Sequence, residues 1–220
     1  RQGPAPGMAR DQRGERLPVE VVVGTAEHAA DAQLVEQLAA VVNAAYAASV
    51  EDLLGPSAAN HQRVTASEVR GRLRQGGIPG ANRVLHVALH EGRVLGCVSS
   101  TLQPPWTSNG CGHWGLLAVD VSAQGRGVAG ALVAAAERRL AEAGCTEVQI
   151  EYQYTAGHAH SQRLCDWYEG RLGFVSQTGW LLNRLIGMVV GRGGSEFRRL
   201  RRPLTALPPS AAGRPVPAAA

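Results

Sequence analysis

Residues 116–130 decide how this chain folds, and they read Leu-Leu-Ala-Val-Asp-Val-Ser-Ala-Gln-Gly-Arg-Gly-Val-Ala-Gly. An apolar strand pattern runs into a glycine-rich turn, and the turn opens directly into an alanine-rich helix expected over residues 128–143. A helix that begins in this way presents backbone N–H groups that have no partner inside the helix. Such groups bind phosphate oxygens, so the stretch predicts a site for a diphosphate-bearing ligand.

The bulk composition is that of one globular domain. The chain has 220 residues, 45% of them hydrophobic, and all 22 of its basic residues other than histidine are arginine. A net charge of +4 suits anionic small ligands as well as nucleic acid. The 4 cysteines form no Cys-x-x-Cys pair, so we expect a reducing compartment, the cytoplasm, and neither a disulfide framework nor a structural zinc site. No apolar run reaches the roughly 18 residues that span a membrane.

Hydrophobic periodicity predicts strands and helices in alternation. The expected strands cover residues 19–24, 84–90, 94–101, 113–121, 146–152, a short stretch from 174, and 196–204. The expected helices follow Thr25 to about residue 50, and cover 65–75, 128–143 and 161–172. These elements predict an α/β fold with a central mixed, mostly antiparallel sheet and helices on both faces. Residues 17–204 are expected to form one domain, between a disordered lead-in at 1–16 and a flexible Ala/Pro tail at 205–220.

The turn and its surroundings resemble a known family. Residues 124–129 fit the pattern Gln/Arg-x-x-Gly-x-Gly/Ala, Leu-Ala-Val-Asp precedes them at 117–120, and Tyr168 with Leu-Gly-Phe at 172–174 follows. A P-loop would need Gly-Lys-Ser/Thr, and a dinucleotide fingerprint would follow the first strand rather than the fourth. Over about residues 19–182 the chain therefore resembles the GNAT N-acetyltransferase family, which implies a GNAT-like acyl-CoA N-acyltransferase fold.

The resemblance implies acetyl-CoA as co-substrate and no metal. In the family, backbone N–H groups of the turn hold the CoA diphosphate, and the matching residues here are Gly125, Arg126, Gly127, Val128, Ala129 and Gly130. The pantetheine arm pairs with the strand before the turn, here Leu117, Ala118 and Val119, and the Val119 N–H would bind the thioester carbonyl. The Arg126 side chain either contacts phosphate or faces solvent. Ser161 stands where many relatives carry a CoA-binding asparagine.

Two residues are expected to carry the proton transfers. Glu151 stands where many family members place a glutamate that deprotonates the amine, although it also suits a solvent-facing strand position. His113 is a second candidate for the base, or a residue that lines the acceptor pocket, or a structural histidine. Tyr168 is expected to protonate the CoA sulfur. Its spacing to Gly173 is one residue longer than the family's Tyr-x-x-x-Gly-Phe, which a bulge or an extra half-turn would absorb; otherwise Trp167 points inward.

The acceptor site is expected between residues 43–61, the Pro104-Pro105-Trp106 loop and residues 152–160. Its expected walls are Trp106, Tyr152 and Tyr154. Its acidic residues, Glu51, Asp52 and Glu151, would attract a cationic amine. The predicted function is direct transfer of an acetyl group from acetyl-CoA to a primary amine, on a small molecule, a peptide N-terminus or a lysine. The protein is expected to act as a monomer or homodimer without nucleic acid or membrane.

Three alternatives remain open at this point. The departures at Tyr168 and Ser161 keep alive a catalytically silent acyl-CoA-binding or sensing module. His158, His160 and Cys165 invite a metal site, but their spacing matches no standard one. The arginine cluster at 198, 199, 201 and 202 suits nucleic acid, but with one aromatic nearby it fits a solvated edge strand better.

Overall fold

The computed structural model describes residues 16–54, 62–177 and 195–204. One seven-stranded sheet has the order β1-β2-β3-β4-β5-β7-β6. Its strands are β1 (Glu20–Val23), β2 (Arg83–His90), β3 (Arg93–Thr101), β4 (Cys111–Val119), β5 (Glu147–Thr155), β6 (Val175–Ser176) and β7 (Ser195–Pro203). The helices are α1 (Ala26–Ala30), α2 (Ala32–Leu54), α3 (Ala66–Gln75), α4 (Val128–Glu142) and α5 (Ala159–Cys165), with a 3-10 helix η2 (Val121–Ala123) and a π-helix η3 (Asp166–Arg171). The predicted lead-in, apart from Arg16, and the predicted tail lie outside the described residues.

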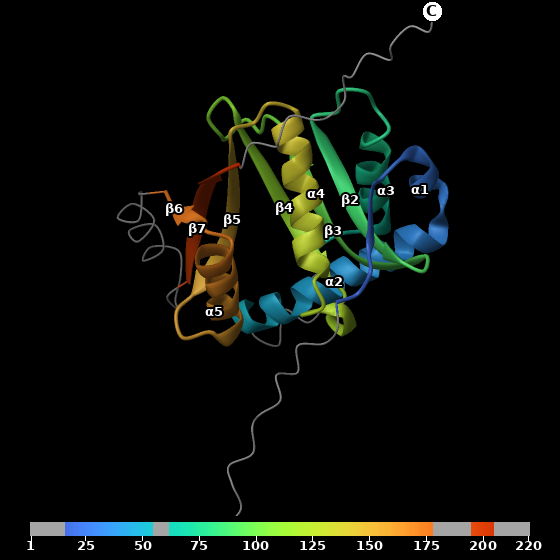
Figure 1. The fold of residues 1–220 in the computed structure, drawn as a ribbon. Helices are drawn as coiled ribbons and strands as arrows, with labels where there is room; N and C mark the ends of the chain where they lie inside the picture. The colour runs from blue at the N-terminus through green and yellow to red at the C-terminus, as the bar shows by residue number, and fades with distance from the viewer. Residues whose placement is uncertain (1–15, 55–61, 178–194, 205–220) are drawn as a thin grey trace, which may run out of the picture.

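Helices cover both faces of the sheet. Figure 1 shows α4 and α5 in front of it and α2 and α3 behind it. One buried cluster, with Leu132 and Ile150 among its members, joins α4 to the strands, and a second, with Leu38 and Leu73, joins α2 and α3 to the other face. Neighbouring strands are antiparallel except β4 and β5, which are parallel and are connected by α4. This arrangement confirms the predicted fold class.

Local capping and turn signals account for several element boundaries. The Thr65 hydroxyl accepts the Glu68 N–H at 3.1 Å, and the Glu68 carboxylate accepts the Thr65 N–H at 2.8 Å, so the capping box predicted to open α3 is confirmed. The hairpin between β2 and β3 turns at Glu91 and Gly92, with φ of 50° and 77°. Two successive residues with positive φ match the twist of the strands that they join.

The long helix predicted after Thr25 is wrong in one respect, because it is two helices. Asp31 has ψ of 103° and cannot continue a helix. Its carboxylate accepts the Leu34 N–H at 3.0 Å and so caps α2 from the side chain. Helix α2 then continues to Leu54, beyond the predicted end. A side chain that competes for backbone hydrogen bonds therefore outweighs the apolar periodicity across it.

Two other predicted boundaries are corrected on β5 and β7. Strand β5 continues through Thr155 rather than ending at residue 152, since it pairs with β7 along its whole length. Strand β7 lies between β5 and β6, so the arginine-rich segment is an interior strand and not the solvated edge strand that its composition suggested.

A buried polar chain connects α4 to the sheet. The Arg139 guanidinium donates to the Ser100 hydroxyl at 3.1 Å, and that hydroxyl lies 2.8 Å from Nε2 of His86. His86 and Ser100 are 3% and 0% exposed. The Ser100 oxygen accepts from Arg139, and the contact between Ser100 and a neutral His86 is formed in either tautomer of the ring. Burial, together with the charge of Arg139, lowers the pKa of His86 from 6.5 to about 4.

The burial of a neutral His86 leads us to expect that the fold loses stability in mild acid. Above pH 6.5 His86 is neutral in both states, but between pH 6.5 and about 4 the unfolded chain binds a proton that the folded chain does not. The free energy of unfolding should therefore fall by roughly 3 kcal/mol over that window, measured by urea unfolding. The slope should be reduced in His86→Gln and kept in the control His90→Gln. Equal slopes in wild type and His86→Gln would contradict the assignment.

Candidate active site

Strands β4 and β5 stop pairing soon after they begin. Within the described residues, pairing between them covers Cys111–His113 with Glu147–Gln149 and goes no further. A bulge follows on β4, where Gly115 pairs with Ser99 but Ala118 pairs with Cys97, so one extra residue is accommodated. Leu116, in the bulge, has φ of 51°, which costs a residue with a Cβ about 1–2 kcal/mol. Because a bulge bends its strand, β4 turns away from β5, and Figure 1 shows the two diverging toward the end of the sheet where α4 begins.

The last residue of β4 faces this separation. The Asp120 N–H donates to the Leu95 carbonyl on β3 at 2.8 Å. Successive N–H groups alternate in direction along a strand. The Val119 N–H is therefore directed away from β3, while the N–H of Ala118, which pairs with Cys97, is directed toward β3. The Val119 carbonyl accepts from the Gln124 side-chain amide at 3.3 Å. The Val119 N–H is therefore directed toward the space between the separated strands.

The glycine-rich turn ends in a helix start without a side-chain cap. Gly125 and Gly127 have φ of 75° and 90°, a region that residues with a Cβ rarely adopt. Gly127 is the N-cap of α4, and a glycine has no side chain with which to cap the N–H groups of the first turn. Those N–H groups belong to Val128, Ala129 and Gly130. The turn therefore combines free donors with the positive end of the helix dipole.

Glu151 on β5 is held by a polar network on the face of the sheet opposite α4. Its Oε2 lies 2.9 Å from Nε2 of His113, and its Oε1 accepts from the side-chain amide of Gln149 and lies 3.5 Å from Nε of Arg199. Burial alone would raise the pKa of Glu151, but the hydrogen bond and charge of His113, the hydrogen bond of Gln149 and the charge of Arg199 outweigh it and lower that pKa below 4.5. Both carboxylate oxygens of Glu151 therefore have partners within the protein, and Glu151 is not a solvent-facing strand residue.

Further contacts fix the two neighbours of Glu151. Gln149 is 0% exposed, and its amide oxygen accepts from Nε of Arg201 at 2.7 Å. The same arginine donates to the Ser108 hydroxyl at 3.1 Å. The Trp106 ring meets His113 edge-on, with centroids 5.6 Å apart and planes at 79°. Trp106 is 43% exposed, so one wall of the network remains open to solvent.

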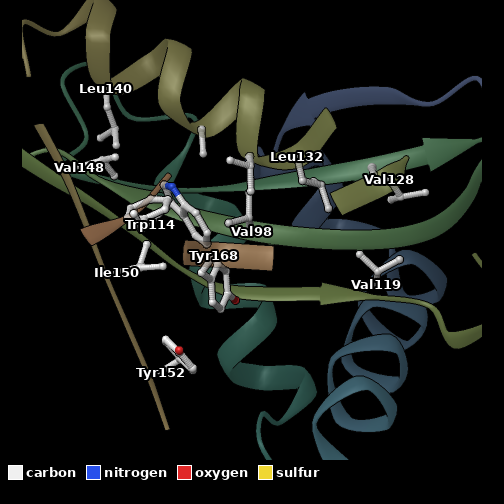
Figure 2. Close-up of a cluster of buried hydrophobic side chains, with 14 of the residues drawn as sticks. Val98, Trp114, Val119, Val128, Leu132, Leu140, Val148, Ile150, Tyr152 and Tyr168 are labelled. Carbon is white, nitrogen blue, oxygen red and sulfur yellow. The ribbon is translucent and has the colours of Figure 1, made fainter. Parts of the chain in front are cut away.

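Tyr168 lies inside the cluster on the α4 face, where Figure 2 shows it beside Trp114. It belongs to the π-helix η3, in which the Leu172 N–H donates to the Trp167 carbonyl five residues back. A π-turn holds one more residue than an α-turn, so it absorbs the residue that the sequence has in excess before Gly173. Tyr168 and not Trp167 is the buried residue of η3. Burial, with the nearby phenol of Tyr46, raises the pKa of Tyr168 above 10.0.

Other predicted site residues lie elsewhere. Tyr152 and Tyr154 alternate with Glu151 along β5 and so point to the opposite face, where Tyr152 donates to Glu169 at 2.8 Å and Tyr154 stacks under Arg198 at 3.6 Å. They do not share a wall with Trp106. Ser161 is 4% exposed, and its hydroxyl oxygen accepts the Thr155 N–H at 3.1 Å.

The predicted acceptor segment at residues 43–61 is described only in part. Asn43 has a structural role, because its side chain accepts the Arg63 and Val64 N–H groups at 2.8 and 3.0 Å and donates to the Val64 carbonyl at 2.9 Å. This contact brings the Arg63 guanidinium to 5.1 Å from the Tyr46 ring. The side chains of Glu51 and Asp52, and the whole of His61, fall outside the described part of the chain.

All four arginines of the cluster on β7 contact groups of the protein itself. Arg198 pairs with Glu169 at 2.9 Å, Arg199 with Glu151 at 3.5 Å, and Arg202 with Glu137. Arg201 donates to Gln149 at 2.7 Å. Each of the four side chains therefore has a polar partner within the protein.

Several residues of the site escaped prediction. Gln149 and Arg201 sit on the same faces of their strands as Glu151 and Arg199, and polar alternation along β5 is the signal that shows it. Tyr46 fits the apolar stripe of α2, and no pattern in the sequence distinguishes it from the core residues of that stripe. Arg16 and Leu17 also lie against the turn. The Leu17 N–H donates to the Arg126 carbonyl at 3.1 Å, and Cγ of Arg16 would lie 3.7 Å from a Cβ added to Gly127.

Two kinds of feature are missing from the part of the chain that the structure describes. It contains no group of three or more His, Cys, Asp or Glu side chains placed to hold a metal ion. None of its helices is long and apolar enough to cross a membrane.

Comparisons with known proteins agree with this geometry. The model of the acetyltransferase (GNAT) family matches residues 62–174, more than half of the 220 residues. The chain therefore belongs to the GNAT family, whose members are acetyl-CoA-dependent acyltransferases. A search of the curated proteins finds no match.

Solved structures share the fold at low identity. An N-acetyltransferase from Staphylococcus aureus is 14% identical, with a TM-score of 0.55 over 86% of this chain and 99% of that one. The GNAT domain of S. lividans PAT is 17% identical, with a TM-score of 0.56 over 84% and 90%. PaiA N-acetyltransferase from Thermoplasma acidophilum, solved in complex with coenzyme A, is 10% identical, with a TM-score of 0.55 over 83% and 98%.

The start of α4 offers a direct test of the phosphate site. Gly130 lies in the first turn, and a Cβ there would meet nothing within 4 Å. Gly130→Glu should stabilise the fold by about 1 kcal/mol, through helix propensity and the helix dipole, because no contact opposes it. The same carboxylate would repel a diphosphate, so CoA affinity should fall about tenfold or more.

The matched control is Gly71→Glu, on the exposed side of α3, where a Cβ also meets nothing within 4 Å. It adds the same charge and a similar propensity gain away from the turn, so CoA affinity should stay unchanged. Isothermal titration with CoA decides between them. Unchanged affinity in Gly130→Glu would place the diphosphate elsewhere.

Proposed function

We propose that this chain transfers the acetyl group of acetyl-CoA to a primary amine by direct attack in a ternary complex. One observation carries the proposal. Strands β4 and β5 separate at the same end of the sheet where α4 begins, and the start of α4 has no side-chain cap. Glu151 flanks the separation on one face of the sheet and Tyr168 on the other. Family membership supports acetyl-CoA as the donor.

Acetyl-CoA would bind along the last part of β4 and the turn. The N–H groups of Gly125, Arg126, Gly127, Val128, Ala129 and Gly130 would hold the diphosphate. The pantetheine arm would extend the sheet beside Leu117, Ala118 and Val119, with the alternate residues Leu117 and Val119 supplying the bonds. Ser161, whose hydroxyl keeps its proton for donation, would contact the arm near the end of β5.

The reaction requires from the protein a donor to the oxyanion, a proton for the leaving sulfur and a route for the proton that the amine loses. The amine nitrogen attacks the thioester carbonyl, the C–N bond forms, and the Val119 N–H stabilises the oxyanion. The C–S bond then breaks, and the leaving sulfur takes a proton from the phenol of Tyr168, which burial keeps in its neutral, protonated form. The proton lost by the amine leaves on the side of Glu151. Proximity of the two substrates supplies much of the remaining rate.

The acceptor would enter on the face that carries Glu151 and the exposed Trp106. A carboxylate beside an aromatic ring suits a cationic amine, which supports a primary amine on a small molecule, a peptide N-terminus or a lysine. All four cysteines of the chain are free thiols, which supports a reducing compartment such as the cytoplasm.

The test is release of free thiol from acetyl-CoA, with and without a pooled panel of amines and peptide N-termini. Tyr168→Phe keeps the packed ring and removes the proton donor, so kcat should fall about 100-fold while CoA affinity and stability are retained. Tyr154→Phe, on the same face with its hydroxyl toward Gln162, is the control and should leave kcat unchanged.

The outcomes separate the proposed enzyme from a silent module. Release that depends on an acceptor supports the transferase. A protein that binds CoA but releases no thiol with any acceptor would instead support an acyl-CoA-binding or sensing module. Full activity in Tyr168→Phe would remove Tyr168 from the acid role and leave the transferase intact.

A further inference from the structure

The two oxygens of Glu151 are both engaged before any substrate arrives. Oε2 faces Nε2 of His113 at 2.9 Å, while Oε1 faces the Gln149 amide and Nε of Arg199. Gln149 is completely buried and is itself held by Arg201, so its amide cannot turn away to free the carboxylate. A carboxylate bound in this way by three donors is a weak proton acceptor toward an amine. The group best able to receive the proton is therefore next to Glu151 rather than Glu151 itself.

We propose that His113 is the catalytic base and that Glu151 is the residue that positions it. An ionised carboxylate can only accept a hydrogen bond, so Nε2 of His113 carries the proton of the contact and Nδ1 carries the lone pair. This inference rests on the proposed function and assigns the atom that accepts the amine proton. The lowered pKa of Glu151 agrees with an ionised partner.

The imidazole is fixed on three sides. Trp106 meets it edge-on at 5.6 Å, and Glu151 bonds it from β5. Gly115, two residues along the same strand, makes room for the ring, since a Cβ there would lie 2.9 Å from Cε1 of His113. The side chains of His113 and Glu151 are 14% and 13% exposed, so the pair is shielded and yet reachable. A ring held in one orientation gives Nε2 to the carboxylate and leaves Nδ1 outside that contact.

The step balances without any further reactant. The acceptor first releases its ammonium proton to solvent; the neutral nitrogen then forms its bond to the acetyl carbon, and one of its remaining protons passes to Nδ1 of His113. The resulting imidazolium is stabilised by the Glu151 carboxylate at 2.9 Å. The C–S bond breaks, and Tyr168 protonates the sulfur. The other charged groups near the pair are Arg199 and Arg201 on β7 and Glu147, which lies 4.0 Å from Arg201.

The first test needs no acceptor and uses the full chain. Long-range proton–nitrogen NMR spectra report which nitrogen of His113 carries the proton, with His113→Gln used to assign the signal. The expected result is the Nε2–H tautomer in wild type and loss of that single tautomer in Glu151→Gln. A wild-type imidazole protonated on Nδ1, or one that is fully protonated at the assay pH, would overturn the proposal.

The second test compares variants by kinetics in the thiol-release assay. His113→Gln should lower kcat about 100-fold with the KM for acetyl-CoA unchanged. Glu151→Gln should lower kcat less, because the base remains and only the counter-charge of the imidazolium is lost. His90→Gln, at the far end of β2, is the control. A larger loss in Glu151→Gln than in His113→Gln would make Glu151 the base.

The two tests distinguish the inference from the function on which it rests. If the wild type releases no thiol with any acceptor, the proposed transferase fails, and the tautomer still decides whether Glu151 orients His113. If the wild type is active but His113→Gln retains its kcat, the transferase stands and the base assignment falls.

Discussion

The site depends on one constraint, which is that β4 and β5 cannot stay hydrogen-bonded along their length. The bulge at Leu116 bends β4 after its pairing with β5 has covered three residue pairs. A continuous parallel sheet at this place would bond the Val119 N–H to β5 and leave nothing for a ligand. Because the strands separate, the Val119 N–H and the N–H groups of the first turn of α4 lie at the same end of the sheet, outside the pairing between strands.

Side chains from both faces hold the separated strands in place. On the α4 face, aromatic rings fill the space between the strands, with the Tyr168 ring 5.9 Å from Trp114 and 5.1 Å from Tyr152. On the other face, the buried Gln149 and the arginines of β7 form a polar network around Glu151. Each arginine on β7 has a carboxylate or amide partner within the protein, although Nε of Arg202 is buried without a hydrogen-bond partner among the described residues. The same network that joins β7 to β5 also holds the side chains of Glu151 and His113.

Much of the fold follows from local signals in the sequence. The capping box at Thr65, the turn at Glu91-Gly92 and the glycine-rich turn are short-range features, and their physics is complete within a few residues. Asp31 shows where such reading fails, because its side chain ends one helix and caps the next inside an unbroken apolar period. Counting residues to Gly173 predicts a bulge or an extra half-turn near Tyr168, and the structure has a π-helix there. The network around Glu151 was not, since it depends on the register of β5 with β7, whose partners are some fifty residues apart.

The central claim is that CoA binds where β4 leaves β5, and mapping backbone amide signals during a titration with CoA tests it most directly. The account predicts the largest nitrogen–proton shift changes at Leu117, Val119 and residues 125–130, with smaller changes at Tyr168 and little change on β1 and β2. Changes concentrated on the outer strands, or on Phe197 and its neighbours on β7, would contradict the account, because the ligand would then bind away from the separated strands.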